Sequence, residues 1–233
     1  MKSHRTASPR RADSPAAKRR VLVVDDHPII RQGLVLLIDG EPDLIVCGQA
    51  EAAQPAAAAI ASLRPDIVIL DISLGGQDGL ELLKQIRVRD GDLPVLILSM
   101  HDESIYAERA LRAGANGYIM KQEATDLVLT AVRRILDGQV YLPDRVASRM
   151  LRQYARGVSV EARSPLASLS DRELEVFRLI GGGSSTRQIA DTLHLSVKTV
   201  ESYQAHIKEK LALRTAHELH HRAIEWAVSE KAK

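Results

Sequence analysis

The sequence predicts an α/β fold, a five-stranded doubly wound parallel sheet, followed by a smaller all-α domain of four helices. Between residues 20 and 140, five short runs rich in Val, Ile and Leu alternate with stretches of helical spacing. From Leu169 onward the strand-like runs stop and helix-capping signals take over. The net charge changes as well, from −8 over residues 21–143 to +4 over residues 144–233, which indicates two modules with different partners.

Composition narrows the class of protein. The chain has 233 residues, of which 45% are hydrophobic and 27% charged, as expected of a globular protein. Only 3% are aromatic, which argues against a protein that stacks single-stranded bases on aromatic side chains. The longest uncharged run, residues 52–63, is too short for the roughly 20 residues of a membrane span. Cys47, the single cysteine, excludes an internal disulfide and is expected to be a small buried residue.

Residues 1–19 are expected to form a disordered basic tail. The first 20 residues hold seven Lys or Arg against one Asp, with almost no apolar side chain to bury. No hydrophobic run follows these charges, so the segment is not a secretory signal. A solvated tail is the favoured interpretation; a tail that adds non-specific DNA affinity and, less well supported, an organellar transit peptide are the alternatives.

The alternating region supplies the elements of the sheet in order. Helical spacing is expected around residues 29–37, 60–63, 80–86, 105–111 and 127–135. Right-handed crossovers through these helices would make all the strands parallel. The carboxyl ends of the strands would then lie along one edge, where such folds place their chemistry. The expected strands are residues 21–24, 44–47, 67–70, 95–98 and 117–120.

Polar side chains follow four of the five expected strands. Asp25 and Asp26 follow the first strand, Asp71 the third, Ser99 the fourth and Lys121 the fifth. A single Asp at a strand end is most often a turn former or a helix cap. Three carboxylates in one crevice repel each other unless a cation is present, and oxygen ligands suit Mg²⁺. The lysine adds positive charge, and the hydroxyl can hydrogen-bond an added oxyanion.

Four segments of this region are distinctive, namely VLVVDDHPIIRQG, DIVILDISLGGQDGLELLKQIR, VLILSMHDE and AGANGYIMKQE. Through them, residues 20–139 resemble the receiver domain of bacterial two-component response regulators, which has a flavodoxin-like fold with strand order 2-1-3-4-5. The resemblance implies that Asp71 accepts a phosphoryl group. It also implies that Asp26, Asp71 and the backbone carbonyl of Ser73 hold Mg²⁺, with Asp25 bonding a metal-bound water.

The same resemblance implies a conformational switch. Lys121 would pair with the phosphoryl group, the hydroxyl of Ser99 would move toward it, and Tyr118 would turn inward when Ser99 does. A phosphoryl group adds nearly two negative charges, which can bias such a two-state element. Ser73, Met100 and His101 flank the site, and we hypothesise that they set how fast water reaches the phosphorylated aspartate.

Residues 140–168 are expected to form a linker with a short helix over 144–154, ended by Gly157 and by Ser164-Pro165.

Beyond the linker, Ser170 and Ser185 begin capping boxes. Gly181 to Gly183 end the first helix of this region and lack the Lys-Ser/Thr of a phosphate loop. Ser196 caps a third helix reaching about residue 211, and a fourth covers about 217–229. The second and third helices have helix-turn-helix spacing.

Residues 169–233 resemble the LuxR-type helix-turn-helix domain. The resemblance is carried by LSDRELEVFRLI, TRQIADTLHLSVKTVESYQAHIKEKL and RTAHELHHRAIEWA. Together with the receiver-like segment, it makes the whole chain similar to the NarL/FixJ group of response regulators. The resemblance implies a DNA-binding transcription regulator.

The faces of the third helix follow from a spacing of 100° per residue. Val197, Val200, Ile207 and Leu211 are expected to face the core, and Tyr203 is expected mainly to pack. The opposite face is expected to enter the major groove of DNA. The candidates for phosphate contacts are Arg187, Lys198 and Thr199, and those for base edges are Glu201, Ser202 and Ala205.

The last helix contains a misleading motif. Residues 217–221 fit the H-E-x-x-H pattern of zinc proteases, but a domain of this size offers neither a third ligand nor a cleft. We therefore expect the apolar stripe of this helix to pack on the core or on a dimer partner, which favours inverted DNA half-sites. The stripe is Leu219, Ala223, Ile224 and Val228.

The sequence thus predicts a cytoplasmic regulator that is not an enzyme. Its expected partners are a cognate histidine kinase, double-stranded DNA and a second copy of the chain, with RNA polymerase as a further candidate and no membrane. A haloacid-type phosphatase also uses an Asp nucleophile with Mg²⁺, but it needs an acid two positions later, where Ser73 stands. A module that works constitutively, without phosphorylation, is the other alternative.

Overall fold

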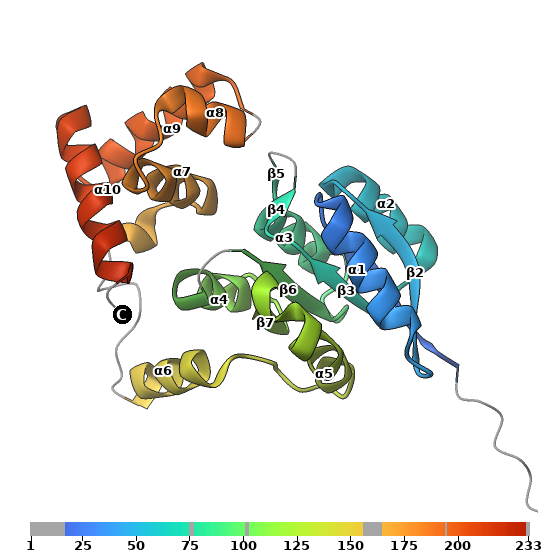
Figure 1. The fold of residues 1–233 in the computed structure, drawn as a ribbon. Coiled ribbons are helices and arrows are strands. Elements are labelled where there is room, and N and C mark those ends of the chain that lie inside the picture. The colour runs from blue at the N-terminus through green and yellow to red at the C-terminus, as the bar shows by residue number, and fades with distance from the viewer. Residues whose placement is uncertain (1–16, 75–76, 101–102, 156–164, 194, 232–233) are drawn as a thin grey trace, which may run out of the picture.

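The computed structural model describes residues 17–74, 77–100, 103–155, 165–193 and 195–231, so residues 1–16 of the expected tail lie outside it. An α/β domain carries the N-terminal half, and a bundle of helices carries the C-terminal part (Figure 1). No described helix is both long and apolar enough to cross a membrane.

The five predicted strands form one sheet with the order β2-β1-β3-β6-β7. Every neighbouring pair is parallel, so the predicted doubly wound sheet is confirmed. The first strand begins before the expected residue 21, because Arg19 and Arg20 pair with Leu44 and Ile45 of the second strand. The strands are β1 (Arg19–Val24), β2 (Leu44–Ala50), β3 (Ile67–Leu70), β6 (Val95–Ser99) and β7 (Gly117–Met120).

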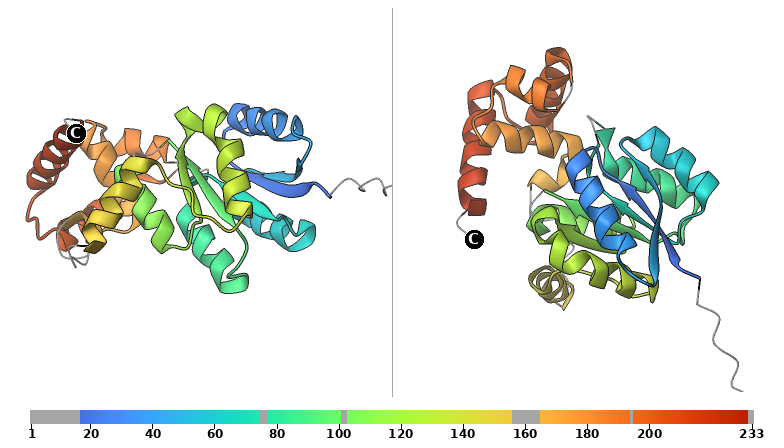
Figure 2. Two further views of the ribbon diagram at one scale, coloured as in Figure 1. Left: turned by 90° about the horizontal axis from the view of Figure 1, so that it is seen from below. Right: turned by 45° about the vertical axis from the view of Figure 1, so that its right-hand side comes forward.

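Helices cover both faces of the sheet (Figure 2). Helices α1 (Pro28–Asp39) and α5 (Ala124–Leu136) pack on one face, where Val21 and Val23 point. Leu22 and Val24 point to the other face, since side chains alternate along a strand. That face is covered by α2 (Ala53–Leu63), α3 (Gly79–Arg89) and α4 (Glu103–Arg112). Cys47 is only partly buried against this second cluster, less than expected.

A small antiparallel hairpin follows β3 and was not predicted. It consists of β4 (Ser73–Leu74) and β5 (Gln77–Asp78), with Ser73 paired to Asp78. Strands of two residues are too short to leave a periodic pattern in the sequence. The hairpin leads directly into α3, whose first turn is capped by the Asp78 side chain accepting from Leu80 N–H.

The linker begins along the edge of the sheet. The carbonyl oxygen of Tyr141 accepts from the N–H of Tyr118 at 3.0 Å, which occupies part of the edge of β7. The predicted linker helix is present as α6 (Asp144–Ala155), and a 3₁₀ turn covers Pro165–Ser168. The predicted breaks at Gly157 and Ser164 lie outside the described residues.

The C-terminal domain has the four predicted helices, α7 (Asp171–Gly181), α8 (Thr186–Thr192), α9 (Val197–Lys210) and α10 (Ala216–Lys231). Ser170 and Ser185 form the predicted capping boxes, and the Ser196 hydroxyl accepts from the N–H of Thr199. One expectation is wrong: Val197 is 42% exposed and does not face the core. It is the first residue of α9, so no preceding turn holds it against the bundle.

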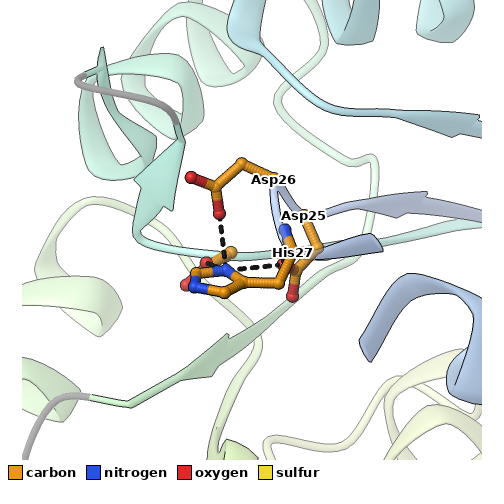
Figure 3. A group of neighbouring side chains, drawn as sticks. Asp25, Asp26 and His27 are labelled. Carbon is orange, nitrogen blue, oxygen red and sulfur yellow. Dashed lines mark hydrogen bonds and ion pairs between the residues drawn. The ribbon is translucent and has the colours of Figure 1, made fainter. Parts of the chain in front are cut away.

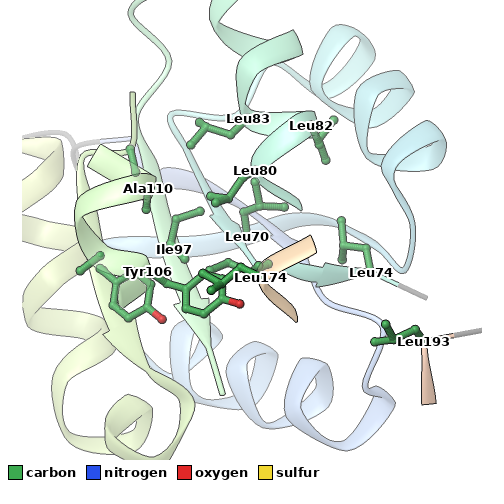
Figure 4. Packing of buried hydrophobic residues seen from close by; sticks show 14 of the residues in the cluster. Leu70, Leu74, Leu80, Leu82, Leu83, Ile97, Tyr106, Ala110, Leu174 and Leu193 are labelled. Atoms are coloured by element: carbon green, nitrogen blue, oxygen red, sulfur yellow. The ribbon is translucent and has the colours of Figure 1, made fainter. Parts of the chain in front are cut away.

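Side chains buried in the C-terminal domain are Leu174, Phe177, Ile180, Ile189, Val200, Ile207, Leu219 and Ala223. The ring of Phe177 lies 5.7 Å from that of Trp226, joining α7 to α10. Tyr203 is packed against this cluster, as expected. The same cluster of buried side chains extends across both domains. It includes Tyr106 of α4 in the receiver-like domain and Leu174 of α7 in the C-terminal domain (Figure 4).

Candidate functional site

The polar residues predicted at the strand ends lie at one edge of the sheet. Asp25 and Asp26 follow β1, Asp71 follows β3, Ser99 is the last residue of β6 and Lys121 follows β7. Asp25, Asp71, Ser99 and Lys121 are all buried, although each is polar or charged. Buried charges need partners, and these residues supply them to one another.

Lys121 links two of the carboxylates. Its Nζ lies 2.7 Å from Oδ2 of Asp71 and 2.7 Å from Oδ2 of Asp25. One lysine therefore offsets two buried negative charges, and Asp26 adds a third carboxylate nearby. The site carries an excess of negative charge.

The pKa of Asp71 is raised from the ordinary value of 3.8 to about 7. Burial is the largest cause and the charge of Asp25 acts in the same direction, while Lys121 acts in the opposite direction. An added cation would relieve the repulsion. The ligand atoms of Asp25, Asp26, His27 and Asp71 all lie within 4.8 Å of one another, and carboxylate oxygens are what Mg²⁺ prefers.

His27 is the member of this group that the sequence analysis missed. Its Nδ1 lies 2.6 Å from Oδ1 of Asp26 and 3.2 Å from Oδ1 of Asp25 (Figure 3). The same nitrogen lies 3.4 Å from Nζ of Lys121. The one signal in the sequence was its position directly after Asp25-Asp26. That signal is weak, because the residue after a strand end can point in many directions.

The backbone around Asp71 is tightly packed. The Asp71 N–H donates to the carbonyl of Val24 at 2.8 Å, which ties the residue to β1. A Cβ on Gly79 would lie 2.1 Å from the carbonyl oxygen of Asp71, so only glycine fits where α3 begins. The hairpin that starts at Ser73 is thus held directly against the predicted phospho-acceptor.

The predicted switch residues are both inside the protein. Ser99 and Tyr118 are fully buried on the neighbouring strands β6 and β7, and Tyr118 lies opposite Ile97 in the strand register. Met100, which follows Ser99, is 54% exposed. Ser73 is partly buried, and His101 lies outside the described residues.

The predicted DNA-contacting face lies open on the C-terminal domain. Thr199 is only partly exposed, and its hydroxyl is 2.7 Å from that of the capping Ser196. The Ser202 hydroxyl donates to the carbonyl of Lys198 at 3.0 Å. Both hydroxyls therefore already have partners within α9. The exposed members of the predicted set are Arg187, Lys198, Glu201, Ser202 and Ala205.

The two domains meet through α4 and the residues that lead into α7. The Arg109 guanidinium donates to the carbonyls of Leu166 and Leu169, each at 2.8 Å, and to Oδ1 of Asp171 at 2.9 Å. The same side of α7 brings Asp171 and Glu175 near Asp78. Burial, followed by the charge of Asp171, raises the pKa of Asp78 to about 6. The hydrogen bonds of Arg109 therefore stabilise the contact, whereas the negative charges of Asp78, Asp171 and Glu175 repel each other and weaken it.

A chain of polar contacts runs from the acidic site into the C-terminal domain. The Ser73 hydroxyl lies 3.5 Å from Oε1 of Glu175 on α7. Arg172 pairs with Glu175 and donates to the carbonyl of Leu193, at the turn between α8 and α9, at 3.0 Å. The side chain of Ser73, two residues after Asp71, is thus connected through Glu175 and Arg172 to the helix-turn-helix.

The fold and the site define a protein with a receiver module and a helix-turn-helix module. Residues 21–133 match the response regulator receiver domain family, and residues 167–223 match the bacterial regulatory proteins of the luxR family. The chain is 32% identical over 216 residues to the oxygen regulatory protein NreC of Staphylococcus carnosus, covering 91% of this chain and 98% of that one. The chain belongs to the NarL/FixJ group of two-component response regulators, which are DNA-binding transcription regulators.

Other relatives agree. The transcriptional regulatory protein DegU of Brevibacillus brevis is 30% identical over 207 residues, covering 83% of this chain and 88% of its own. Among solved structures, RcsB from Salmonella enterica serovar Typhimurium, bound to promoter rprA with the phosphomimetic BeF₃⁻, has a TM-score of 0.56 at 25% identity. The match covers 88% of this chain and 97% of RcsB. A second RcsB structure contains two dimers bound to two parallel DNAs, with a TM-score of 0.54 at 26% identity and 88% and 97% coverage.

Proposed function

We propose that Asp71 accepts a phosphoryl group from a cognate histidine kinase and that this modification controls DNA binding. The observation that carries the proposal is the buried cluster in which Lys121 bridges Asp71 and Asp25. An Asp71 oxygen would form a bond to phosphorus while the phosphorus–nitrogen bond to the kinase histidine breaks, and that nitrogen takes up a proton. Lys121 is placed to neutralise charge on the transferred oxygens.

The carboxylates of Asp26 and Asp71 and the carbonyl of Ser73 would hold Mg²⁺, with Asp25 bonding a metal-bound water. The set fits this ion because it offers oxygen atoms and an excess of negative charge. When bound, Mg²⁺ neutralises charge on the transferring phosphoryl group. Ser73 stands where a haloacid-type phosphatase needs an acid, which supports a regulator over an enzyme.

The signal has two routes out of the site. In one, the Ser99 hydroxyl moves toward the phosphoryl group and Tyr118 responds on the next strand. In the other, a change at Ser73 acts on Glu175 and so on the seating of α7. Phosphorylation adds charge beside both routes, and the like charges between the domains leave their contact easy to weaken.

The released C-terminal domain would bind double-stranded DNA as a homodimer on inverted half-sites, in the cytoplasm, with RNA polymerase as a further candidate partner. The predicted contacts are Arg187, Lys198 and Thr199 to phosphates and Glu201, Ser202 and Ala205 to base edges. The open face of α9 and the RcsB–DNA structures support this part of the proposal. The proposed boundaries are a tail over 1–19, a receiver over 20–139, a linker over 140–168 and the DNA-binding domain over 169–233.

Intact-mass measurement tests the proposal. The full chain is incubated with Mg²⁺ and a small-molecule phosphoryl donor, beside Asp71→Asn and the exposed-site control Asp137→Asn. We expect one phosphoryl group on the wild type and on Asp137→Asn, and none on Asp71→Asn or in EDTA. A phosphoryl group on Asp71→Asn would contradict the assignment of the acceptor, and no modification of any form would favour a constitutive DNA-binding protein.

A further inference from the structure

The side chain of His27 contacts carboxylate oxygens of the proposed metal site. Its Nδ1 is 2.6 Å from Oδ1 of Asp26 and 3.8 Å from Oδ2 of Asp71, the two side chains proposed as metal ligands (Figure 3). The contact with Asp26 is a close approach of the nitrogen to a carboxylate oxygen, whereas the hydrogen bond of Nδ1 goes to Oδ1 of Asp25, where the nitrogen donates because an ionised carboxylate only accepts. Asp25 lies 3.2 Å from the same nitrogen, so the ring engages both members of the Asp25-Asp26 pair.

The imidazole and a magnesium ion exclude each other at this position. Mg²⁺ binds oxygen ligands at about 2.1 Å and demands close to octahedral geometry. A ring nitrogen 2.6 Å from Asp26 Oδ1 occupies the approach to that oxygen, and while its N–H is directed at Asp25 it offers the ion no lone pair. Binding of Mg²⁺ to Asp26 therefore requires His27 to break its contacts.

The side chain is free to turn while its backbone stays in place. His27 is the N-cap residue of α1, but its ring makes no capping hydrogen bond, and the side chain is 54% exposed. Its backbone N–H donates to Oδ1 of Asp25 at 2.8 Å, which fixes the main chain. Moving the ring into solvent would break its contacts with the acidic site and leave the backbone hydrogen bond in place.

We propose that His27 is a gate for the metal, whose imidazole competes with Mg²⁺ for the oxygens of Asp25 and Asp26. The proposal rests on the proposed function of the site. His27 is a positioning residue in this account, which does not ligate the metal and sets how much Mg²⁺ is needed before Asp71 can be phosphorylated. The competition is a property of binding and can be measured without any phosphoryl donor.

The test uses the full-length protein and Mn²⁺ as a spectroscopic probe at a single pH. Free Mn²⁺ is followed by electron paramagnetic resonance, and Mg²⁺ affinity is obtained by competition. Removing contacts of a half-exposed side chain should tighten Mg²⁺ binding about threefold to tenfold in His27→Ala. The matched control is His220→Ala, which removes an exposed imidazole on α10 whose Nδ1 lies 2.8 Å from the carbonyl oxygen of Ala216.

Each outcome decides one point. Unchanged affinity in His27→Ala would show that the ring does not compete. Weaker affinity, together with a ¹⁴N coupling to bound Mn²⁺ that His27→Ala loses, would show that His27 is a ligand; either result overturns the gate. Asp26→Asn should abolish binding. If neither the wild type nor His27→Ala binds Mn²⁺, the proposed metal site is wrong. That result differs from equal binding by both proteins, which would disprove only the competition by His27.

Discussion

Asp71 is held in a place that disfavours its own charge. The residue is 2% exposed, and the carboxylate of Asp25 lies close enough to raise its pKa further, against the opposing effect of Lys121. Lys121 cannot neutralise both carboxylates, so the folded protein carries an unfavourable electrostatic interaction at this site. Such an arrangement favours the binding of a cation and opposes folding when none is bound.

Replacing Asp71 should therefore stabilise the protein. Its folded-state pKa of about 7 lies above the ordinary 3.8, so the wild type loses stability as the pH rises from about 4 to 7. An asparagine does not titrate. In EDTA, we expect Asp71→Asn to unfold with a free energy about 1–3 kcal/mol higher than the wild type at pH 7.5, with a much smaller difference at pH 4.5. Urea unfolding measures this, and an equal difference at both pH values would argue against it.

Lys198 offers a second prediction at the scale of one residue. Its exposed side chain lies in the first turn of α9, where a DNA phosphate can reach it. We expect Lys198→Ala to weaken binding to all DNA sequences alike and to lower the slope of log affinity against log salt by about 1. Titrations at several salt concentrations test this, with Arg222→Ala on α10 as the control. An altered sequence preference in Lys198→Ala would instead indicate a base contact.

At the scale of elements, α4 and α7 form the joint between the domains. Arg109 on α4 donates to two carbonyls and one carboxylate of the segment that leads into α7. Its three acceptors belong to the C-terminal part of the chain, so this single side chain spans the joint. The outer face of α9 is open.

Arg109→Ala should loosen this joint. Loss of three charge-assisted hydrogen bonds should reduce the free energy of domain docking by about 1–3 kcal/mol, because some of the freed acceptors regain water. We expect a larger radius of gyration by small-angle X-ray scattering and tighter DNA binding without phosphorylation. Arg112→Ala is the matched control, since Arg112 lies on the same helix and pairs only with Glu108 of its own domain. Identical scattering from both variants would show that Arg109 does not hold the domains together.

At the scale of the whole molecule, the predicted apolar stripe of α10 is partly buried and partly exposed. Leu219 and Ala223 are buried in the domain core, whereas Ile224 is 48% and Val228 63% exposed. The exposed pair lies on the outward side of the same helix, next to Trp226 and Ala227, which contact α7. This placement suits an interface with a second copy on DNA.

Ile224→Asp should separate dimerisation from DNA contact. A charge placed in an apolar interface should lower the affinity for DNA with two inverted half-sites at least about tenfold, while binding to a single half-site is unchanged. Electrophoretic mobility shifts on both DNAs measure this. Val88→Asp, which introduces the same charge at an exposed apolar residue near the end of α3, is the control. Equal losses on both DNAs would indicate damage to the domain itself.

Local patterns in the sequence determined most of the architecture. Short apolar runs located all five strands; the signal is clearest for β3 and β6, because a strand buried on both faces has no polar side to show. Ser170, Ser185 and Ser196 located three helix starts, since a capping hydroxyl bonds a backbone N–H only a few residues away. The strand ends then brought Asp25, Asp71 and Lys121 together, as parallel topology requires.

Only the tertiary structure decided what depends on contacts between distant segments. The pairing of Ser73 with Asp78, the place of His27 among the carboxylates and the reach of Arg109 to Asp171 leave no periodic trace in the sequence. The exposure of Val197 is a similar case, because a helical wheel assumes neighbours that the first turn of a helix lacks. Short-range propensities are encoded residue by residue, whereas these contacts depend on side-chain direction and on how whole elements pack.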